Sequence, residues 1–305
     1  MTRILSYNIQ TGGMHRIDKL ATIIEATRAD VIGLTEATNP HVAEELAKKL
    51  GMHLRLSGQA KHHKDWHVGL LSRLPIKDMQ AHVRPDILTK QHLLEVTIEE
   101  NNGDPLTAFV VHLTADFYKG VESNRIRRAE VQEILNIMSV RRGTPHLLMG
   151  DFNAIAPGEG LKTSTLLSYV FDPEQEYLKQ YTNAIGQTEL DIVTRSSIRI
   201  LKAIPGNTLL SAITNSASLL YAPRAGLELL YKAGYVDCYR RVNPRTPGYT
   251  YPASSPAGRI DFIFASPELA PRLEKSHVVV KAAGVPGHEA SDHLPVFAEF
   301  SSGES

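Results

Sequence analysis

Several short polar clusters lie at the ends of apolar runs along almost the whole chain, and they constrain its fold more than any other feature. Apolar runs such as residues 147–149 and 262–264 have the length and composition of buried strands. A strand end is a position at which a fold can hold carboxylates and imidazoles rigidly. We therefore expect the clusters to meet in one assembled site. The clusters are Tyr7-Asn8, Thr35-Glu36, His112, Gly150-Asp151-Phe152-Asn153, Arg259-Ile260-Asp261 and Ser291-Asp292-His293.

Helix-like and strand-like patterns alternate in the first half of the chain. Helical spacing of apolar residues covers residues 17–26 and 40–50, and Asn39 and Gly51 are suited to cap and to stop the second segment. Residues 125–138 carry the apolar stripe of a helix that packs on a core. Strands are predicted at residues 66–75, 93–99 and 106–113.

Composition is consistent with one domain spanning residues 1–305. Hydrophobic residues make up 42% of the 305, which is enough for a sizeable core. The single cysteine, Cys238, excludes an intramolecular disulfide, so the fold does not need an oxidising compartment. The chain starts in a strand pattern without a secretory signal, and no apolar run reaches the roughly 18 residues that span a bilayer. We expect a cytoplasmic protein.

The order of the polar clusters is Asn, Glu, His, Asp-x-Asn, Asp and Asp-His. This order resembles the endonuclease/exonuclease/phosphatase superfamily, which includes deoxyribonuclease I and the exonuclease III type of apurinic endonucleases, and residues 150–153 and 291–296 are the most specific pieces. The resemblance spans nearly the whole chain. It implies an α/β (α+β) fold, a four-layer α-β-β-α sandwich of two packed mixed sheets with helices outside. It also implies a divalent-metal-dependent hydrolase that cleaves phosphodiester bonds by water attack.

A metal site is expected at the first and last of these clusters. Phosphodiester hydrolysis needs a divalent cation, a means of activating water and stabilisation of the leaving oxygen. Glu36 and Asp292 offer carboxylate oxygens, which Mg²⁺ or Mn²⁺ prefers, and Asn8 would hold the site or complete it as a ligand. The plainer interpretation makes Glu36 a charge near a helix N-terminus and Asn8 a turn residue. The order of the clusters favours the metal site.

Catalytic roles are expected for the remaining polar residues. His293 is the histidine best suited to catalysis, because Asp261 is placed to fix its tautomer. Two mechanisms are open: His293 takes the proton from water, or it stays protonated and steadies the phosphate while Asp151 takes the proton. Asn153 lies on the same side of its turn as Asp151 and could orient the nucleophile, although both residue types also favour Asx turns. His112 resembles the family position that contacts the scissile phosphate.

The chain departs from compact family members at two places. Residues 161–223 make a longer link between the Asp-x-Asn turn and residues 234–237, and we predict an inserted folded cap there, with helical or mixed segments at 174–185 and 209–221. Such an insert could contact substrate as a lid or binding loop, or it could only cover a surface. Gln10 stands where apurinic endonucleases carry another acidic metal ligand, so we expect weaker metal binding, or a single ion, and little activity at abasic sites.

Net charge leaves the substrate open. Lysine plus arginine equals aspartate plus glutamate at 33 each, so no global positive field attracts polyanions. The arginines of one predicted helix and its end could form a local basic face, or could lie on a solvated helix face. They are Arg125, Arg127, Arg128, Arg141 and Arg142.

Nucleic acid, DNA or RNA, is the leading substrate hypothesis, because many family members cleave it. The alternative is a small-molecule or phospholipid phosphodiester, which the neutral charge and the long insert favour. A third hypothesis, a catalytically inactive binding protein, is disfavoured because every expected polar group is present. No obligate protein partner is evident from the sequence.

Overall fold

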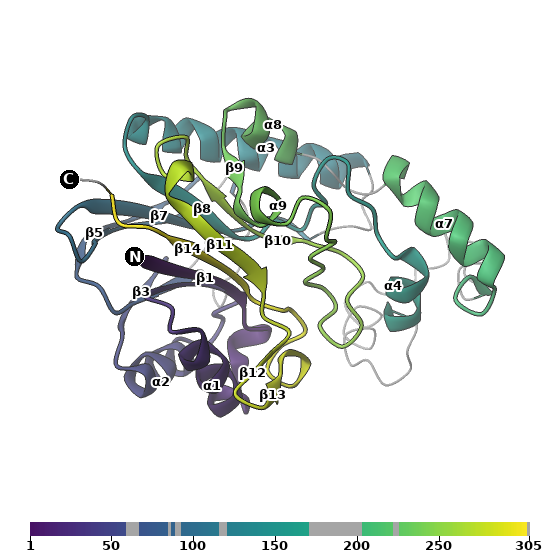
Figure 1. The fold of residues 1–305 in the computed structure, drawn as a ribbon, viewed down its shortest axis with the longest axis horizontal. Coiled ribbons are helices and arrows are strands. Elements are labelled where there is room, and N and C mark those ends of the chain that lie inside the picture. The colour runs from purple at the N-terminus through teal and green to yellow at the C-terminus, as the bar shows by residue number, and fades with distance from the viewer. Residues whose placement is uncertain are drawn as a thin grey trace.

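The described residues of the chain form two six-stranded sheets that pack face to face, with helices on both outer faces (Figure 1). This is the four-layer sandwich that the family resemblance implied. Both sheets are mixed, because each contains a parallel pair of strands among antiparallel ones. The computed structural model describes residues 1–58, 67–84, 87–88, 93–115, 121–170, 203–221 and 226–303.

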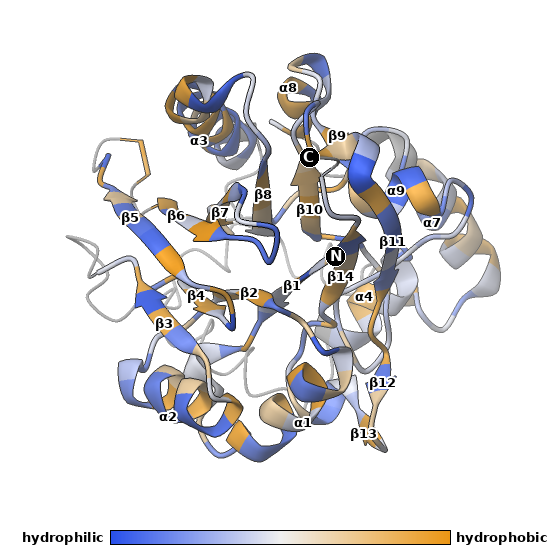
Figure 2. Ribbon diagram, turned by 60° about the vertical axis from the view of Figure 1, so that its left-hand side comes forward, coloured by the Kyte–Doolittle hydropathy of each residue, from blue (hydrophilic) through white to orange (hydrophobic). Residues whose placement is uncertain are grey.

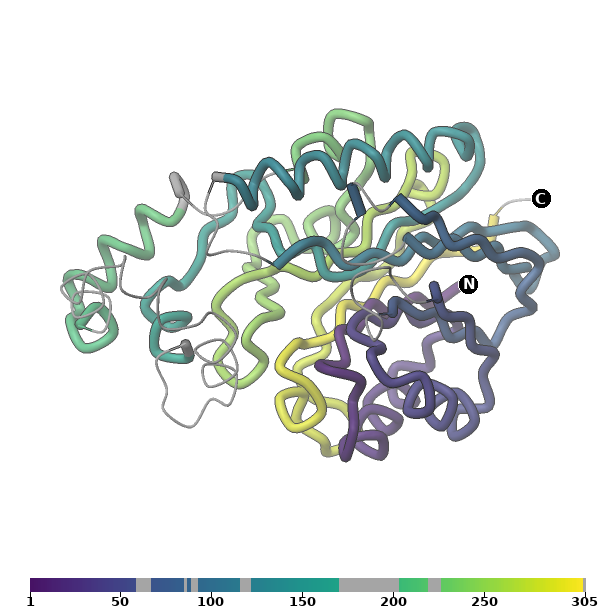
Figure 3. The backbone as a smooth tube through the Cα atoms, turned by 180° about the vertical axis from the view of Figure 1, so that it is seen from behind, coloured from purple at the N-terminus to yellow at the C-terminus, as the bar shows by residue number. Residues whose placement is uncertain are grey.

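The first sheet holds the N-terminal and C-terminal strands side by side. Its strands follow the order β11-β14-β1-β2-β4-β3. Thr2 on β1 lies opposite Phe300 on β14, so the two chain ends meet at one end of the molecule (Figure 3). Helices α1 (Ile17–Thr27) and α2 (Pro40–Leu50) cover the outer face. The strands are β1 Thr2–Asn8, β2 Val31–Thr35, β3 His53–Leu56, β4 Gly69–Ser72, β11 Leu273–Val278 and β14 Val296–Phe300.

The second sheet follows the order β5-β6-β7-β8-β10-β9. Helices α3 (Val121–Met138) and α8 (Leu227–Lys232) cover its outer face (Figure 1). The strands are β5 Ile76–His82, β6 Leu93–Glu99, β7 Pro105–His112, β8 His146–Asp151, β9 Val236–Asp237 and β10 Asp261–Ala265. The smaller elements are α4 Thr163–Val170, α7 Thr208–Tyr221, α9 Cys238–Val242, the hairpin of β12 Lys281–Ala282 and β13 Val285–Pro286, and the 3-10 helices Thr11–Gly13, Ser139–Arg141, Ala270–Arg272 and Gly287–Glu289.

Apolar side chains fill the space between each pair of successive layers. Ile4 and Leu5 are neighbours on β1, yet Ile4 packs between the two sheets and Leu5 packs toward α1 and α2, because successive strand side chains point to opposite faces. Phe109 and Ile134 pack together between the second sheet and α3. The central strands therefore pack apolar side chains on both faces, and this explains their continuous apolar runs in the sequence. Strands β8, β10 and β14 are mainly in the hydrophobic colour in Figure 2.

The helices and strands predicted in the first half of the chain are present, and their observed bounds differ from the predicted ones at the ends. Helix α2 begins after Asn39, whose side chain accepts a hydrogen bond of 3.1 Å from the His41 N–H, and ends at Gly51 with φ 63°. The helix predicted at 125–138 begins earlier, at Val121, and the strand predicted at 66–75 is shortened to Gly69–Ser72.

The arginines of α3 do not form a basic face, and both sequence-based interpretations were wrong for Arg127. Its side chain is 1% exposed, and its guanidinium donates to the Thr114 carbonyl, the Ser123 hydroxyl and the Asn124 side chain. Helical spacing alone does not distinguish a buried guanidinium with this many acceptors from a solvated one. Three other arginines of this segment pair with carboxylates: Arg125 with Glu122, Arg128 with Glu228 and Arg141 with Glu95.

Two helices, α4 and α7, are described within residues 161–223, and they pack against each other. Helix α7 (Thr208–Tyr221) agrees with the helix predicted at 209–221, whereas the one predicted at 174–185 lies outside the described residues. The single domain with an inserted cap stays a prediction. None of the helices in the described ranges is both long enough and apolar enough to cross a membrane.

Gly150 is the residue at which the second sheet most strictly excludes a side chain. Its φ is +144°, and a Cβ there would lie 1.8 Å from the Val111 carbonyl oxygen on the neighbouring strand. We expect Gly150→Ala to lower the free energy of unfolding by about 3 kcal/mol, through backbone strain and steric overlap together. Urea denaturation followed by circular dichroism measures this loss.

Gly143→Ala is the matched control for Gly150→Ala. Gly143 also has positive φ, +82°, but a Cβ there would meet nothing within 4 Å. Only backbone strain remains, so the expected loss is about 1 kcal/mol. Equal losses in the two variants would contradict the steric argument.

Candidate active site

Strand register brings three of the predicted residues to one level of the second sheet. Asp151 at the end of β8 lies opposite His112 on the parallel strand β7 and opposite Asp261 on the antiparallel strand β10. The Nε2 atom of His112 is 3.6 Å from the Oδ2 atom of Asp151. All three side chains are buried. Their proximity follows from the pairing of β7, β8 and β10.

The first sheet contributes Asn8 and Glu36 at the ends of two parallel strands, β1 and β2. The Nδ2 atom of Asn8 donates to Glu36 Oε1 at 3.1 Å and, across the interface between the sheets, to Asp151 Oδ2 at 3.0 Å. The Gln10 N–H donates to Asn8 Oδ1 at 2.9 Å, which fixes the orientation of the amide. Asn8 therefore joins the two carboxylates through its nitrogen and has its oxygen engaged by the backbone.

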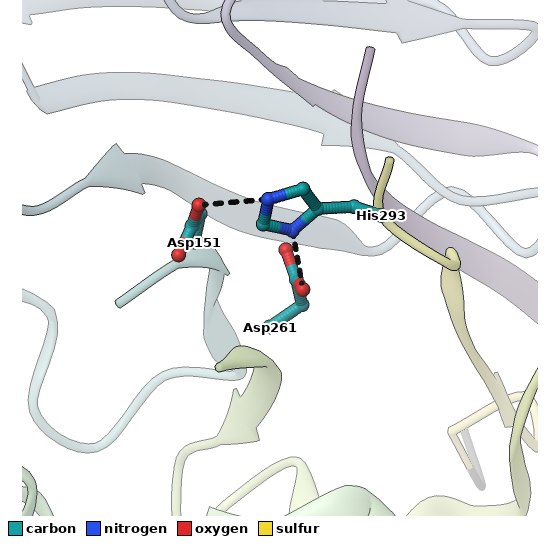
Figure 4. A group of neighbouring side chains, drawn as sticks. All are labelled: Asp151, Asp261 and His293. Carbon is teal, nitrogen blue, oxygen red and sulfur yellow. Dashed lines mark hydrogen bonds and ion pairs between the residues drawn. The ribbon is translucent and has the colours of Figure 1, made fainter. Parts of the chain in front are cut away.

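His293 reaches the same place from the C-terminal part of the chain. Its Nδ1 donates to Asp261 Oδ2 at 2.9 Å, and its Nε2 is 3.8 Å from Asp151 Oδ2 (Figure 4). Ser291 holds this segment in place, because its hydroxyl donates to the Asn8 carbonyl at 2.7 Å and accepts from the His293 N–H at 3.2 Å. The imidazole thus lies between two carboxylates, with one ring nitrogen facing each.

Asn153 lies in a turn that the sequence pattern anticipated. Phe152 points into the apolar core beneath α3, while Asp151 and Asn153 lie on the other side. The Asn153 N–H donates to Asp151 Oδ1 at 2.9 Å, so the Asx turn is present, and Asn153 Nδ2 donates to the Leu113 carbonyl at 3.0 Å. Asn153 therefore orients Asp151 through its backbone and braces the end of β7 through its side chain.

Backbone strain is concentrated in the segments that build the site. Glu36 has φ 55°, Asn153 has φ 46°, and Gln10 and Thr11 have φ 50° and 45°. A non-glycine residue in this region costs roughly 1–3 kcal/mol and persists only where surrounding contacts hold it. The Thr11 N–H supplies one such contact, because it donates to Glu36 Oε2 at 2.7 Å. The unusual backbone of Thr11 is what aims this N–H at the carboxylate.

The pKa values of Asp151 and His293 are shifted by their mutual burial. Burial and the charge of Asp261 raise the pKa of Asp151 to about 6, although His293, His112 and the Asn153 N–H act in the opposite direction. Burial acts to lower the pKa of His293, but Asp261 and Asp151 outweigh it and hold this pKa well above its ordinary value. At neutral pH the site therefore contains a carboxylate beside an imidazolium.

The carboxyls of Glu36 and Asp292 are shifted in opposite directions. Burial acts to raise the pKa of Glu36, but His112, His293 and the hydrogen bonds from Thr11 and Asn8 lower it overall. Burial and the charge of Glu36 raise the pKa of Asp292 to about 6, against the opposing effect of His293 and Arg16. The like charges of Glu36 and Asp292 thus act on each other, which a bound cation would relieve.

Two groups of residues could hold a metal ion. Asp151, Asp261 and His293 have ligand atoms within 4.8 Å of one another, near enough to hold one. However, a histidine must be neutral to bind a metal, and the raised pKa of His293 opposes this. The carboxylates of Glu36 and Asp292 offer the hard oxygen donors that Mg²⁺ or Mn²⁺ prefers, and they fit such an ion better.

Arg16 and Tyr251 also belong to the site, although no sequence pattern singled them out. The guanidinium of Arg16 donates to the carbonyls of Ile9, Gln10 and Ala290, so it ties the end of β1 to the segment that carries Asp292. The Tyr251 ring lies against the His293 ring, with centroids 4.8 Å apart. Arg16 lies directly before a helical pattern, and the position of Tyr251 depends on how a loop folds back, so neither gave a periodic signal.

A sequence model of the Endonuclease/Exonuclease/phosphatase family matches residues 5–293, a range that contains every polar cluster of the site. The chain belongs to this family. Members generally depend on divalent metal ions, and membership supports a hydrolase of the phosphodiesterase or nuclease type that acts on phosphoester bonds. None of the curated proteins matches the sequence.

Several solved structures share the fold over almost the whole chain. An AP endonuclease from Archaeoglobus fulgidus is 17% identical, with a TM-score of 0.61 over 99% of this chain and 100% of its own. The 3′ phosphatase NExo from Neisseria, bound to a product DNA hairpin, is 19% identical, with a TM-score of 0.60 over 99% and 100%. A humanised TDP2 from D. rerio is 14% identical, with a TM-score of 0.61 over 99% of both chains. At these identities the likeness establishes the DNase I-like fold.

Proposed function

We propose that this protein is a Mg²⁺- or Mn²⁺-dependent phosphodiesterase that cleaves nucleic acid, DNA or RNA, by water attack. The observation that supports the proposal most is the position of Asp151, which is buried between the Asn8 amide, His112 and the His293 imidazole. A carboxylate with a pKa of about 6 beside an imidazolium is suited to accept a proton near neutral pH while positive charge faces the phosphate.

The proposed metal ligands are Glu36 and Asp292, with Asn8 holding Glu36 rather than acting as a ligand itself. When bound, the ion would supply charge stabilisation at the phosphoryl oxygens. This arrangement retains Glu36 and Asp292 as the ligands expected from the sequence. Of the two roles that the sequence left open for Asn8, it favours holding the site over binding the metal. Gln10 adds no carboxylate here, because its side chain ends in an amide; its backbone N–H and carbonyl instead bind Asn8 and Arg16.

The proton is proposed to pass from the attacking water to Asp151. The water oxygen forms the new bond to phosphorus, and the leaving oxygen departs with the electron pair of the broken P–O bond and takes a proton from solvent. His293 stays protonated because Asp261 accepts from its Nδ1. Its Nε2 N–H, which faces Asp151, is proposed to donate to the phosphate bound beside that carboxylate. His112 is positioned to donate to the same phosphate, and Asn153 keeps Asp151 in orientation.

A pH profile distinguishes Asp151 from His293 as the base. With Asp151 as the base, kcat/KM should rise about tenfold per pH unit below about pH 6 and level off above it, because Asp151 must be deprotonated to accept a proton. The pKa of Asp292 is also raised to about 6, so this carboxyl would titrate over the same pH range. Saturating magnesium removes its contribution to the pH profile, because the bound ion displaces the proton of Asp292. If His293 were the base, its raised pKa would move the rise to much higher pH.

The proposed function is tested with bis-p-nitrophenyl phosphate and circular plasmid DNA, each with magnesium, with manganese and with a chelator. We expect both substrates to be cleaved with either metal and neither with the chelator. Activity that survives the chelator would contradict the metal dependence. Failure on both substrates with every metal would contradict the enzyme assignment.

A small-molecule phosphodiester is the second candidate substrate. Formal net charge is zero, and helix α4 of the insert lies beside the site through Tyr169 and Tyr251. A site walled in this way suits a compact substrate, whereas a long nucleic acid needs an open, positively charged groove. Hydrolysis of the small diester without cleavage of plasmid DNA would favour this candidate.

A further inference from the structure

Helix α4 of the insert is attached directly to the loop at residues 249–258. The Lys162 N–H, at the start of α4, donates to the Ala257 carbonyl at 2.8 Å. Leu161 packs against the pair of Ile155 and Ile260, and a Cβ on Gly258 would lie 2.6 Å from Leu161 Cδ2, so the loop backbone and the Leu161 side chain approach each other closely. The insert is therefore held against the loop by both polar and apolar contacts.

The same loop is attached to the catalytic segment. The Leu294 N–H donates to the Thr250 carbonyl at 2.8 Å, and the Ala253 N–H donates to the Asp292 carbonyl at 2.7 Å. Between these two hydrogen bonds the Tyr251 ring lies on the His293 ring at 4.8 Å, tilted by 42°. Any group bound at the His293 imidazole thus has Tyr251 as a neighbour.

Tyr169, from the last turn of α4, completes this side of the site. Its ring meets the Tyr251 ring edge-on, with centroids 5.8 Å apart and planes at 80°. Both rings are half-buried, so each keeps some surface accessible to a ligand. Tyr169 and Tyr251 form an aromatic wall, which starts at His293 and ends on the insert. In contrast to this wall, the part of the site that the first sheet contributes is polar, because Asn8 lies there.

We propose that the aromatic wall is a binding subsite for a planar ring that the substrate carries next to its scissile phosphate, with Tyr169 as the specificity-determining residue. The inference rests on the proposed function. A phosphate held at His293 and Asp151 places one of its substituents toward Tyr251, and tyrosine rings bind flat, apolar faces. A nucleobase and a simple aryl group share this chemistry.

Three p-nitrophenyl esters test the subsite for the retained group. In-line attack places the shared p-nitrophenyl leaving group opposite the attacking water, so the three esters differ only in the retained group, which is the one proposed to face the aromatic wall. They are the esters of thymidine 5′-phosphate, phenyl phosphate and methyl phosphate. For Tyr169→Leu, which keeps an apolar side chain without a ring, we expect KM to rise roughly tenfold for the thymidine ester, with kcat unchanged. The methyl ester should keep its KM, and the phenyl ester shows whether any ring suffices or a base is needed. Tyr169→Phe, the matched control, keeps the ring and should behave as wild type.

Equal changes in KM for all three esters would show a structural role for Tyr169 and would overturn the inference. An unchanged KM for all three esters would also overturn it. In either case, hydrolysis of the esters by the wild type would still support the proposed function. If the wild type hydrolyses none of the esters, the proposed function is judged by the plasmid DNA and bis-p-nitrophenyl phosphate assays, and calorimetry decides the subsite separately. The wild type should then bind thymidine 5′-phosphate at least tenfold more tightly than methyl phosphate in magnesium, and equal affinities would overturn the subsite.

Discussion

Asp151→Asn should lower kcat for diester hydrolysis by about 10³- to 10⁴-fold while the protein stays folded. Asparagine has the shape of aspartate but cannot accept the proton of the attacking water. It also disturbs one of two contacts, because Asp151 accepts from the Asn8 amide through Oδ2 and from the Asn153 N–H through Oδ1, and asparagine has only one acceptor oxygen for the two donors. The expected loss therefore combines a missing base with a less ordered site. Rates on bis-p-nitrophenyl phosphate at saturating magnesium measure it.

Asp261→Asn is the informative companion to Asp151→Asn. It keeps the Asp151 carboxylate as the proposed base, although the pKa of Asp151 should fall because Asp261 helps to raise it. It also removes the charge that most strongly raises the pKa of His293. The pKa of His293 should fall, so kcat should drop by about 10²-fold and the activity should decline at a lower alkaline pH than in the wild type, where the imidazolium loses its proton. A variant with an unchanged alkaline limit would contradict the protonated role of His293.

Asp78→Asn is the control for both variants, since Asp78 is an exposed carboxylate on β5. Its activity should stay within about twofold of wild type, because an exposed charge far from the reaction contributes little. Near-normal rates in Asp151→Asn would remove Asp151 from the mechanism. Circular dichroism and urea denaturation of each variant separate a loss of chemistry from a loss of folded protein.

The order of polar clusters was enough to predict which residues meet, but not how they meet. His112, Asp151 and Asp261 are adjacent because β7, β8 and β10 are neighbours in one sheet. Periodicity shows that each residue lies at one end of a strand, His112 and Asp151 at the last position and Asp261 at the first. It says nothing about which strands pair, so the adjacency came from the family resemblance. The helices and their caps, by contrast, follow from local chemistry such as the Asn39 cap.

The features that the sequence did not reveal depend on tertiary contacts. The orientation of the Asn8 amide is set by the Gln10 N–H, which points at it only because Gln10 takes the unusual φ of 50°. The burial of Arg127 depends on the Thr114 carbonyl, which comes from the turn after β7. Tyr251 reaches His293 through a loop that folds back on the C-terminal segment. For Arg127 and Tyr251 the deciding contact comes from another part of the chain, whereas for Asn8 it comes from an unusual local backbone conformation that has no periodic signal.

The second large effect is expected in stability, for Arg259→Met. The Arg259 side chain is fully buried and donates to both oxygens of Asp237 and to both oxygens of Glu159. Its guanidinium also lies over the Phe262 ring, 4.4 Å from the centroid. Methionine would fill much of the space but leave two carboxylates without their main partner. Removing one partner of a buried ion pair costs about 3–5 kcal/mol, and we expect a loss of unfolding free energy in that range.

Arg240→Met provides the matched comparison. Arg240 also pairs with Glu159, at 2.6 Å, but its side chain is 27% exposed. Its removal leaves Glu159 paired with Arg259, so the expected loss is about 1 kcal/mol. Urea denaturation of both variants at neutral pH measures the difference, and a loss for Arg259→Met no larger than that for Arg240→Met would contradict the argument from burial.

The folded fraction of Arg259→Met should nevertheless retain most of its activity. Arg259 lies two positions before Asp261 on the chain, yet its bonds go to Asp237 and Glu159, and the hydrogen bond between Asp261 and His293 does not involve it. Its contribution is to join β9, the loop after the Asp-x-Asn turn and the start of β10 into one unit. We therefore expect kcat, corrected for folded protein, to fall less than about tenfold. A much larger fall would show that the ion pairs of Arg259 with Asp237 and Glu159 also position Asp261. The stability of this part of the fold and the geometry of the site would then depend on the same contacts.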